Sequence, residues 1–183
     1  MRISRFGRFI ATPAALLLGL GSLIVLPSAT AQASVIDQEC LGTVTTTYSP
    51  GLTLAPKPLV TITTDADFSL CTDGAAPSGG YFTNLPFTNY GCLDLLQNAA
   101  GTLPLTWDAT SGDTYSTFPF TGSAQTVGLT KVVTVTGTIS AGRYAGDTAV
   151  LVITFLTADL LACETPSGLQ GLDGTADLTI TGL

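Results

Sequence analysis

Residues 131–155 read KVVTVTGTISAGRYAGDTAVLVITF and give the clearest structural signal in the chain. The runs 131–139 and 148–155 are rich in Val, Ile and Thr, and the loop between them carries Gly142 and Gly146. Two β-branched runs joined by a glycine-bearing loop predict a β-hairpin, although the loop is long for one. Apolar residues fall on both alternating faces of the second run, which predicts a strand buried on both sides.

The same β pattern extends outward from this hairpin in both directions. Further β-rich runs occupy residues 43–48, 59–64, 67–71, 103–106, 115–118 and 176–181. Only residues 93–100 are compatible with a helix, of one or two turns. Turn signals recur about every 8–12 residues, a spacing typical of antiparallel sandwiches. The sequence therefore predicts an all-β, antiparallel fold, and favours a sandwich over a barrel.

The N-terminal segment has the pattern of a secretory signal peptide. Arg2, Arg5 and Arg8 precede an apolar stretch over residues 10–26, and Ala31-Gln32-Ala33 forms an Ala-x-Ala cleavage site. We expect cleavage after residue 33 and one secreted, extracellular domain over residues 34–183, with no membrane span after cleavage. The alternative is a retained signal anchor, for which the apolar stretch is short.

The charge balance of the expected mature chain is strongly acidic. Only Lys57, Lys131 and Arg143 remain against thirteen acidic residues, a net charge of −10. Binding to phosphate backbones requires clustered Lys and Arg, so nucleic acid and anionic lipid are excluded as expected partners. Solubility is a sufficient explanation of this charge.

The residue types needed for common catalytic sites are few. The chain contains no His, which removes Ser-His-Asp and Cys-His arrangements. Three pairs of carboxylates remain: Asp65 with Asp67, Asp108 with Asp113, and Asp173 with Asp177. A glycosidase holds two carboxylates about 5–10 Å apart across a cleft, and calcium sites use regularly spaced acidic loops. Neither pattern is evident, so we expect no catalytic residues, no metal and no cofactor.

Four aromatic residues gather in a segment that also contains Gly and Asn. They are Tyr81, Phe82, Phe87 and Tyr90. The segment is predicted to be an exposed loop, and loops often carry binding function. These side chains are therefore candidates for contacting a ligand or partner. The alternative is a connection whose aromatics cover the edge of the core.

The mature chain contains four cysteines, Cys40, Cys71, Cys92 and Cys163. An even number in an exported chain predicts two disulfides, with three possible pairings. No two cysteines form a C-x-x-C pair, so zinc and redox sites are not indicated.

The order Cys92, Trp107, Cys163 resembles the Cys–Trp–Cys pattern of immunoglobulin-like sandwiches, in which the Trp packs on the bridge between the sheets. Leu161 stands where the tyrosine corner of those domains has Tyr. The resemblance implies an immunoglobulin-like β-sandwich with Cys92 bonded to Cys163 and Cys40 to Cys71. Pairing Cys40 with Cys163 and Cys71 with Cys92, or the crossed set, stays open.

Two further resemblances concern the ends of the mature chain and its general composition. Residues 40–43 (CLGT), 48–53 (YSPGLT), 158–163 (ADLLAC) and 178–180 (LTI) resemble a largely uncharacterised family of small secreted actinobacterial proteins. That resemblance implies no activity and supplies no catalytic residue. The acidic, secreted, two-bridge character is similar to that of the apoproteins of the enediyne chromoproteins, which implies a carrier of a small ligand.

These observations predict a secreted, non-catalytic binding or structural module that acts at or beyond the cell envelope. Its partner would be a protein, a glycan or a small apolar ligand. The alternatives are a small-ligand carrier and, less favoured, a glycoside hydrolase that uses paired aspartates. An apolar cleft would favour the small-ligand carrier. An aspartate pair in one groove would favour the hydrolase, and a flat polar surface would favour the binding or structural module.

Overall fold

The strands follow one another in an antiparallel meander. The computed structural model describes residues 35–182, so the predicted signal peptide and its cleavage site lie outside the described residues. The strands are β1 (Val35–Leu52), β2 (Lys57–Cys71), β3 (Gly79–Tyr90), β4 (Ala99–Trp107), β5 (Tyr115–Val127), β6 (Thr130–Thr138), β7 (Ala141–Gly142), β8 (Thr148–Leu156) and β9 (Leu169–Gly182). Two 3₁₀ helices, η1 (Cys92–Leu96) and η2 (Thr157–Glu164), precede β4 and β9.

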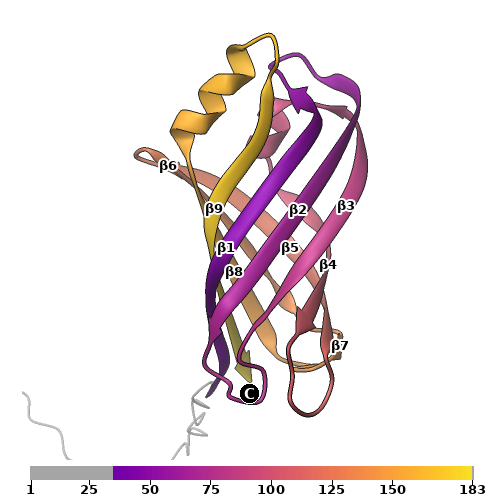
Figure 1. Ribbon diagram of the computed structural model, residues 1–183, viewed down its shortest axis with the longest axis vertical. Helices are drawn as coiled ribbons and strands as arrows, with labels where there is room; N and C mark the ends of the chain where they lie inside the picture. The colour runs from indigo at the N-terminus through magenta and orange to yellow at the C-terminus, as the bar shows by residue number, and fades with distance from the viewer. Residues whose placement is uncertain (1–34, 183) are drawn as a thin grey trace, which may run out of the picture. The chain divides into compact units, whose positions relative to one another are not determined.

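Eight of these strands close into a ring, in the order β1-β2-β3-β4-β5-β6-β8-β9 (Figure 1). The ring is complete because β9 pairs with β1 and β4 pairs with β5. The short β7 pairs with the beginning of β5. The prediction of an antiparallel all-β fold is confirmed, but the sheet closes as a barrel in place of the expected immunoglobulin-like sandwich.

The length of the strands explains this correction. β1, β2 and β9 contain 18, 15 and 14 residues, far more than the short runs predicted from the sequence. The turn signal at residues 49–51 lies inside β1, and the runs 59–64 and 67–71 belong to one strand. Twist accumulates along long strands, and tilted strands can then close on themselves.

The central hairpin is formed as predicted, by β6 and β8. The register pairs Val133 with Ile153 and Val135 with Leu151. These residues point into the barrel, whereas Val150 and Val152 lie on the outer face and are half-buried. The expectation of a strand buried on both sides is therefore wrong, because a barrel has only one buried face.

Two inward glycines allow the strands to bend closely past one another. A Cβ atom on Gly137 of β6 would collide with the carbonyl oxygen of Pro119 in β5. A Cβ atom on Gly174 of β9 would press on the carbonyl of Thr154 and the ring of Phe155 in β8. Glycine at such positions permits sharp bending of a closing sheet.

The helical segments are short. Of the residues expected to be compatible with a helix, 93–96 lie in η1, while Ala99 already begins β4. η2 has no counterpart among the predicted elements. No helix in residues 35–182 is both long and apolar enough to cross a membrane.

The two disulfides join Cys40 to Cys71 and Cys92 to Cys163, the pairing predicted above. Cys40 and Cys71 are register partners on β1 and β2. The second bridge ties η1 to η2 through two cysteines that are 71 residues apart in the sequence. Disulfides persist in oxidising compartments, so the two bridges indicate such an environment for the folded domain.

Candidate functional site

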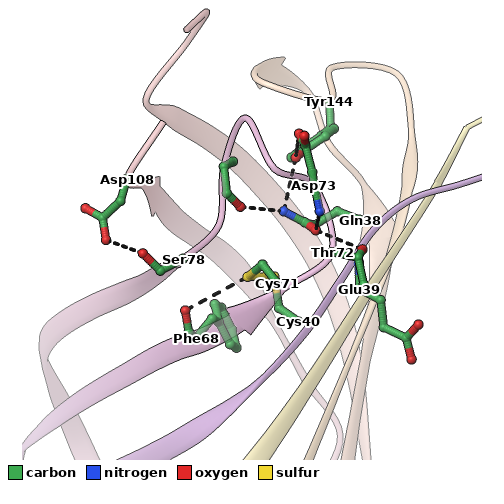
Figure 2. Close-up of a disulfide and its surroundings, with 11 residues drawn as sticks. Gln38, Glu39, Cys40, Phe68, Cys71, Thr72, Asp73, Ser78, Asp108 and Tyr144 are labelled. Carbon is green, nitrogen blue, oxygen red and sulfur yellow. Dashed lines mark hydrogen bonds between the residues drawn. A yellow bond between two sulfur atoms is a disulfide. The ribbon is translucent and has the colours of Figure 1, made fainter. Parts of the chain in front are cut away.

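One end of the barrel is closed by a network of polar side chains around the first disulfide (Figure 2). The buried amide of Gln38 donates to the carbonyl of Ala76 at 2.9 Å, and its oxygen accepts from the Asp73 amide at 2.7 Å. Asp73 also accepts from the guanidinium of Arg143 at 2.9 Å and from the hydroxyl of Tyr144 at 2.7 Å. The hydrogen bond from Arg143, followed by those from the Ala75 amide and the Tyr144 hydroxyl, holds the pKa of Asp73 below its usual range.

Trp107 belongs to this closed end. Its indole N–H donates to the hydroxyl of Ser116 at 2.8 Å, and its ring meets that of Tyr144 edge-on at 5.4 Å between centroids. Cys92 and Cys163 belong to a separate core cluster. The immunoglobulin-like expectation that Trp107 packs on that bridge is therefore wrong, because Trp107 lies at the far end of β4.

The wall of the barrel is incomplete between β3 and β4. The two strands pair only where Gly79, Gly80 and Tyr81 meet Leu105, Thr106 and Trp107. Beyond Tyr81, β3 keeps its partner β2 and β4 keeps its partner β5, but β3 and β4 no longer pair with each other. Pro86 and Pro104 stand in these two strands, and proline is tolerated where a strand edge lacks a partner. We call this separation the side gap.

A cavity lies behind the side gap. Its outer part has a volume of about 450 Å³ and its inner part about 210 Å³. The two parts adjoin, because six residues line both of them: Thr64, Thr83, Gln97, Ala99, Leu103 and Phe120. Ligand sites typically occupy hollows of about 300–1,000 Å³, so the cavity has the size of a small-molecule site.

The lining of the cavity is mostly apolar and comes from every strand of the ring except β9. Ile62, Leu85 and Phe87 line the outer part, and Val133, Val135, Leu151 and Ile153 line the inner part. Leu103 and Phe120 line both. Leu85 and Phe87 point inward by register, opposite Ile62 and Val60, yet they are 51% and 37% exposed. Large apolar side chains exposed at inward positions mark an accessible binding surface.

Charged groups contribute little to this lining. Asp94 is the one ionisable carboxylate among the lining residues, and it accepts from the Gly91 amide at 2.8 Å within its own helical turn. Burial raises the pKa of Tyr81 to about 12 and also raises the pKa of Tyr90, so both phenols are neutral at physiological pH. Lys131 occupies the inward position beyond Val133, outside the lining, and is 4% exposed, which lowers its pKa.

The four aromatic candidates lie on strand β3, not on the exposed loop that the sequence suggested. Tyr81, Phe87 and Tyr90 line the cavity, and the rings of Phe87 and Tyr90 are 5.2 Å apart. Phe82 points outward and is 57% exposed. The segment is a strand because it pairs with β2 over eleven residues, from Phe68 to Lys57. Their role in binding stays a prediction.

The aspartate pairs are distributed over the outer surface. Asp65, Asp67 and Asp108 border a shallow depression of about 310 Å³ beside Phe82, and Asp108 accepts from the Ser78 hydroxyl at 2.6 Å. Asp173 and Asp177 point outward on β9, and Asp173 accepts from Thr45. Asp113 is exposed in the loop before β5. None of these carboxylates lines the cavity.

Several cavity residues were not identified from the sequence. Thr64 and Leu103 are ordinary members of predicted β-rich runs, and Phe120 follows another such run. Only the register of the closed ring brings the three together. The signal that was present is the alternation itself, which marks them as inward residues.

Comparison of the chain with protein-family models, curated proteins and solved structures finds no match.

Proposed function

We propose that this protein is a secreted, non-catalytic carrier that holds one small, mainly apolar molecule inside its barrel. The observation that carries the proposal is the two-part cavity behind the side gap, with its apolar lining. An eight-stranded barrel is wide enough to hold one small ligand. Secretion is supported by the signal pattern of residues 1–33 and by the two disulfides.

The carrier accounts for the site better than the other two predicted functions. A structural or protein-binding module needs a complementary outer surface and gives no reason for a hollow interior. A hydrolase using paired aspartates needs two carboxylates facing the substrate across a cleft. The cavity is lined by the single carboxylate of Asp94, which is engaged by Gly91. Asp65, Asp67 and Asp108 border only a shallow outer depression.

Binding of the neutral fluorescent probe N-phenylnaphthylamine tests the proposal. We expect its fluorescence to rise on addition of the purified domain and to saturate at one probe per chain. Ala99 points into both parts of the cavity, so Ala99→Trp should fill the hollow and abolish the increase. Gln125→Trp adds the same side chain to the exposed outer face of β5 and serves as the matched control.

The proposal is overturned if the probe does not bind, or if Ala99→Trp and Gln125→Trp bind it equally well. Circular dichroism of both variants establishes that the barrel has formed before the binding is compared.

A further inference from the structure

A row of three threonines crosses one wall of the cavity. The register pairs Thr46 of β1 with Thr64 of β2, and Thr64 with Thr83 of β3. All three residues line the inner part of the cavity. They are the same distance along three adjacent strands, so their side chains form a continuous polar strip within an otherwise apolar hollow.

The hydroxyl groups of this threonine row have unused hydrogen-bonding capacity. Thr46 and Thr64 are 3.3 Å apart between hydroxyl oxygens, so one donates to the other and one O–H remains. The Thr83 hydroxyl makes no side-chain hydrogen bond to any residue in the described part of the chain. Two O–H donors and several lone pairs are therefore available to a ligand.

The charges around the cavity decide which kind of polar group fits this strip. No Lys or Arg belongs to the lining, and Asp94 is held by its own helical turn. A carboxylate or ammonium would lose its hydration without a partner of opposite charge, which is costly. A hydroxyl or carbonyl group can exchange its hydrogen bonds with water for bonds with threonine at little cost.

We infer that the threonine row is the polar anchor of the site, and that the ligand is an uncharged molecule with an apolar body and a hydroxyl or carbonyl group. This inference rests on the proposed carrier function. The anchor meets the polar group along the wall formed by β1, β2 and β3. The apolar body lies against Leu103, Phe120 and the inward residues of β6 and β8.

Competition against N-phenylnaphthylamine with three ligands of matched size tests the inference. Decanol carries a hydroxyl group, undecane carries none, and decanoate carries a charge. We expect decanol to compete best in the wild-type domain. Thr83→Val removes a hydroxyl while keeping the shape of the side chain, and it should weaken decanol roughly 3- to 10-fold, the loss of about one hydrogen bond. Undecane should be unaffected.

Thr88→Val is the matched control, since Thr88 lies on the outer face of the same strand and is exposed. It should leave all three ligands unchanged. The double change Thr46→Val and Thr64→Val removes the one O–H that their pair leaves free, and it should repeat the Thr83→Val result.

Three results would overturn the inference while leaving the carrier function intact. The first is probe binding with equal competition by decanol and undecane. The second is equal weakening of both by Thr83→Val, which would indicate a change of cavity shape. The third is strongest competition by decanoate that is lost in Lys131→Met, which would place the anchor at that buried cation. Failure of the probe itself to bind contradicts the carrier function instead.

Discussion

Asp73 is the residue on which the closed end of the barrel depends most. Its carboxylate accepts from Arg143 and Tyr144, and its backbone amide donates to Gln38. The side chain of Arg143 is 13% exposed, and its Nε atom has no hydrogen-bond partner in the described residues. The carboxylate of Asp73 is therefore the main group that balances this positive charge. Removing one partner of such a charge leaves the other poorly solvated.

We therefore expect Asp73→Asn to lower the free energy of unfolding by about 1.5–3 kcal/mol at neutral pH. The folded pKa of Asp73 lies below its usual value. Its stabilising contribution is thus complete above the unfolded pKa and is lost as the pH falls through the folded pKa. Urea unfolding at neutral and acidic pH measures both effects. Asp113→Asn, at an exposed position of a nearby loop, should change little; an equal loss in that variant would contradict the prediction.

The pKa of Asp147 is shifted in the opposite direction to that of Asp73. Partial burial, and then the nearby carboxylate of Asp37, raise its pKa above the usual value. Such a group destabilises the fold at pH values above its folded pKa, and this penalty disappears as the pH falls through that value. Asp147→Asn should therefore raise stability by roughly 0.5 kcal/mol at neutral pH. Asp37→Asn should give a smaller gain, because it removes the neighbouring charge and leaves Asp147 partly buried, and the double variant should gain less than the sum of the two.

At the scale of elements, the bending of β6 against β5 depends on a residue without a side chain. A Cβ on Gly137 would collide with backbone of Pro119, whereas a Cβ on Gly122 would lie 3.5 Å from its nearest neighbour, an ordinary contact. Gly137→Ala should cost about 1–3 kcal/mol through overpacking. Gly122→Ala should be neutral or stabilise the fold by up to about 1 kcal/mol, because alanine lowers the conformational entropy of the unfolded chain. Thermal unfolding tests both predictions. A lower melting temperature for Gly122→Ala than for Gly137→Ala would contradict them.

The second disulfide constrains the chain more than the first. Cys92 and Cys163 are 71 residues apart in sequence, and Cys40 and Cys71 are 31 apart. In the chain-entropy description the longer loop contributes about 4 kcal/mol, about 0.7 kcal/mol more than the shorter one. Replacing Cys92 and Cys163 by Ala should thus lower the melting temperature further than replacing Cys40 and Cys71. The reverse order in calorimetry would show that the shorter bridge carries more of the stability.

How far the sequence predicts this structure differs between elements. The alternation of Val, Thr and Ile in residues 131–139 identified β6, because its pattern is local. β3 was missed because Asn84, Pro86 and Asn89 are typical of loops, and it is a strand only through its long pairing with β2. Aromatic clustering found Phe87 and Tyr90, but Thr46, Thr64 and Thr83 share a row only in the register of the ring, which no local pattern specifies.

At the scale of the whole molecule, a ligand bound in the cavity should raise the stability of the folded domain. A ligand present at one hundred times its dissociation constant stabilises the folded state by about 2.7 kcal/mol. For a domain of this size that corresponds to a rise in melting temperature of about 5–10 °C. Differential scanning calorimetry with N-phenylnaphthylamine should show this rise for the wild-type domain and for Gln125→Trp. A similar rise for Ala99→Trp would place the bound probe outside the cavity.

The pairing of the first strand with the last sets the order in which the barrel can be completed. Val35 faces Gly182 and Thr43 faces Thr175, so β1 stays an open edge until β9 has been synthesised. Closing contacts between such distant segments is slow, because the entropy of a long loop is lost before the contacts form. A nascent chain that ends before β9 therefore cannot close the ring, and the barrel is completed only once β9 has been made.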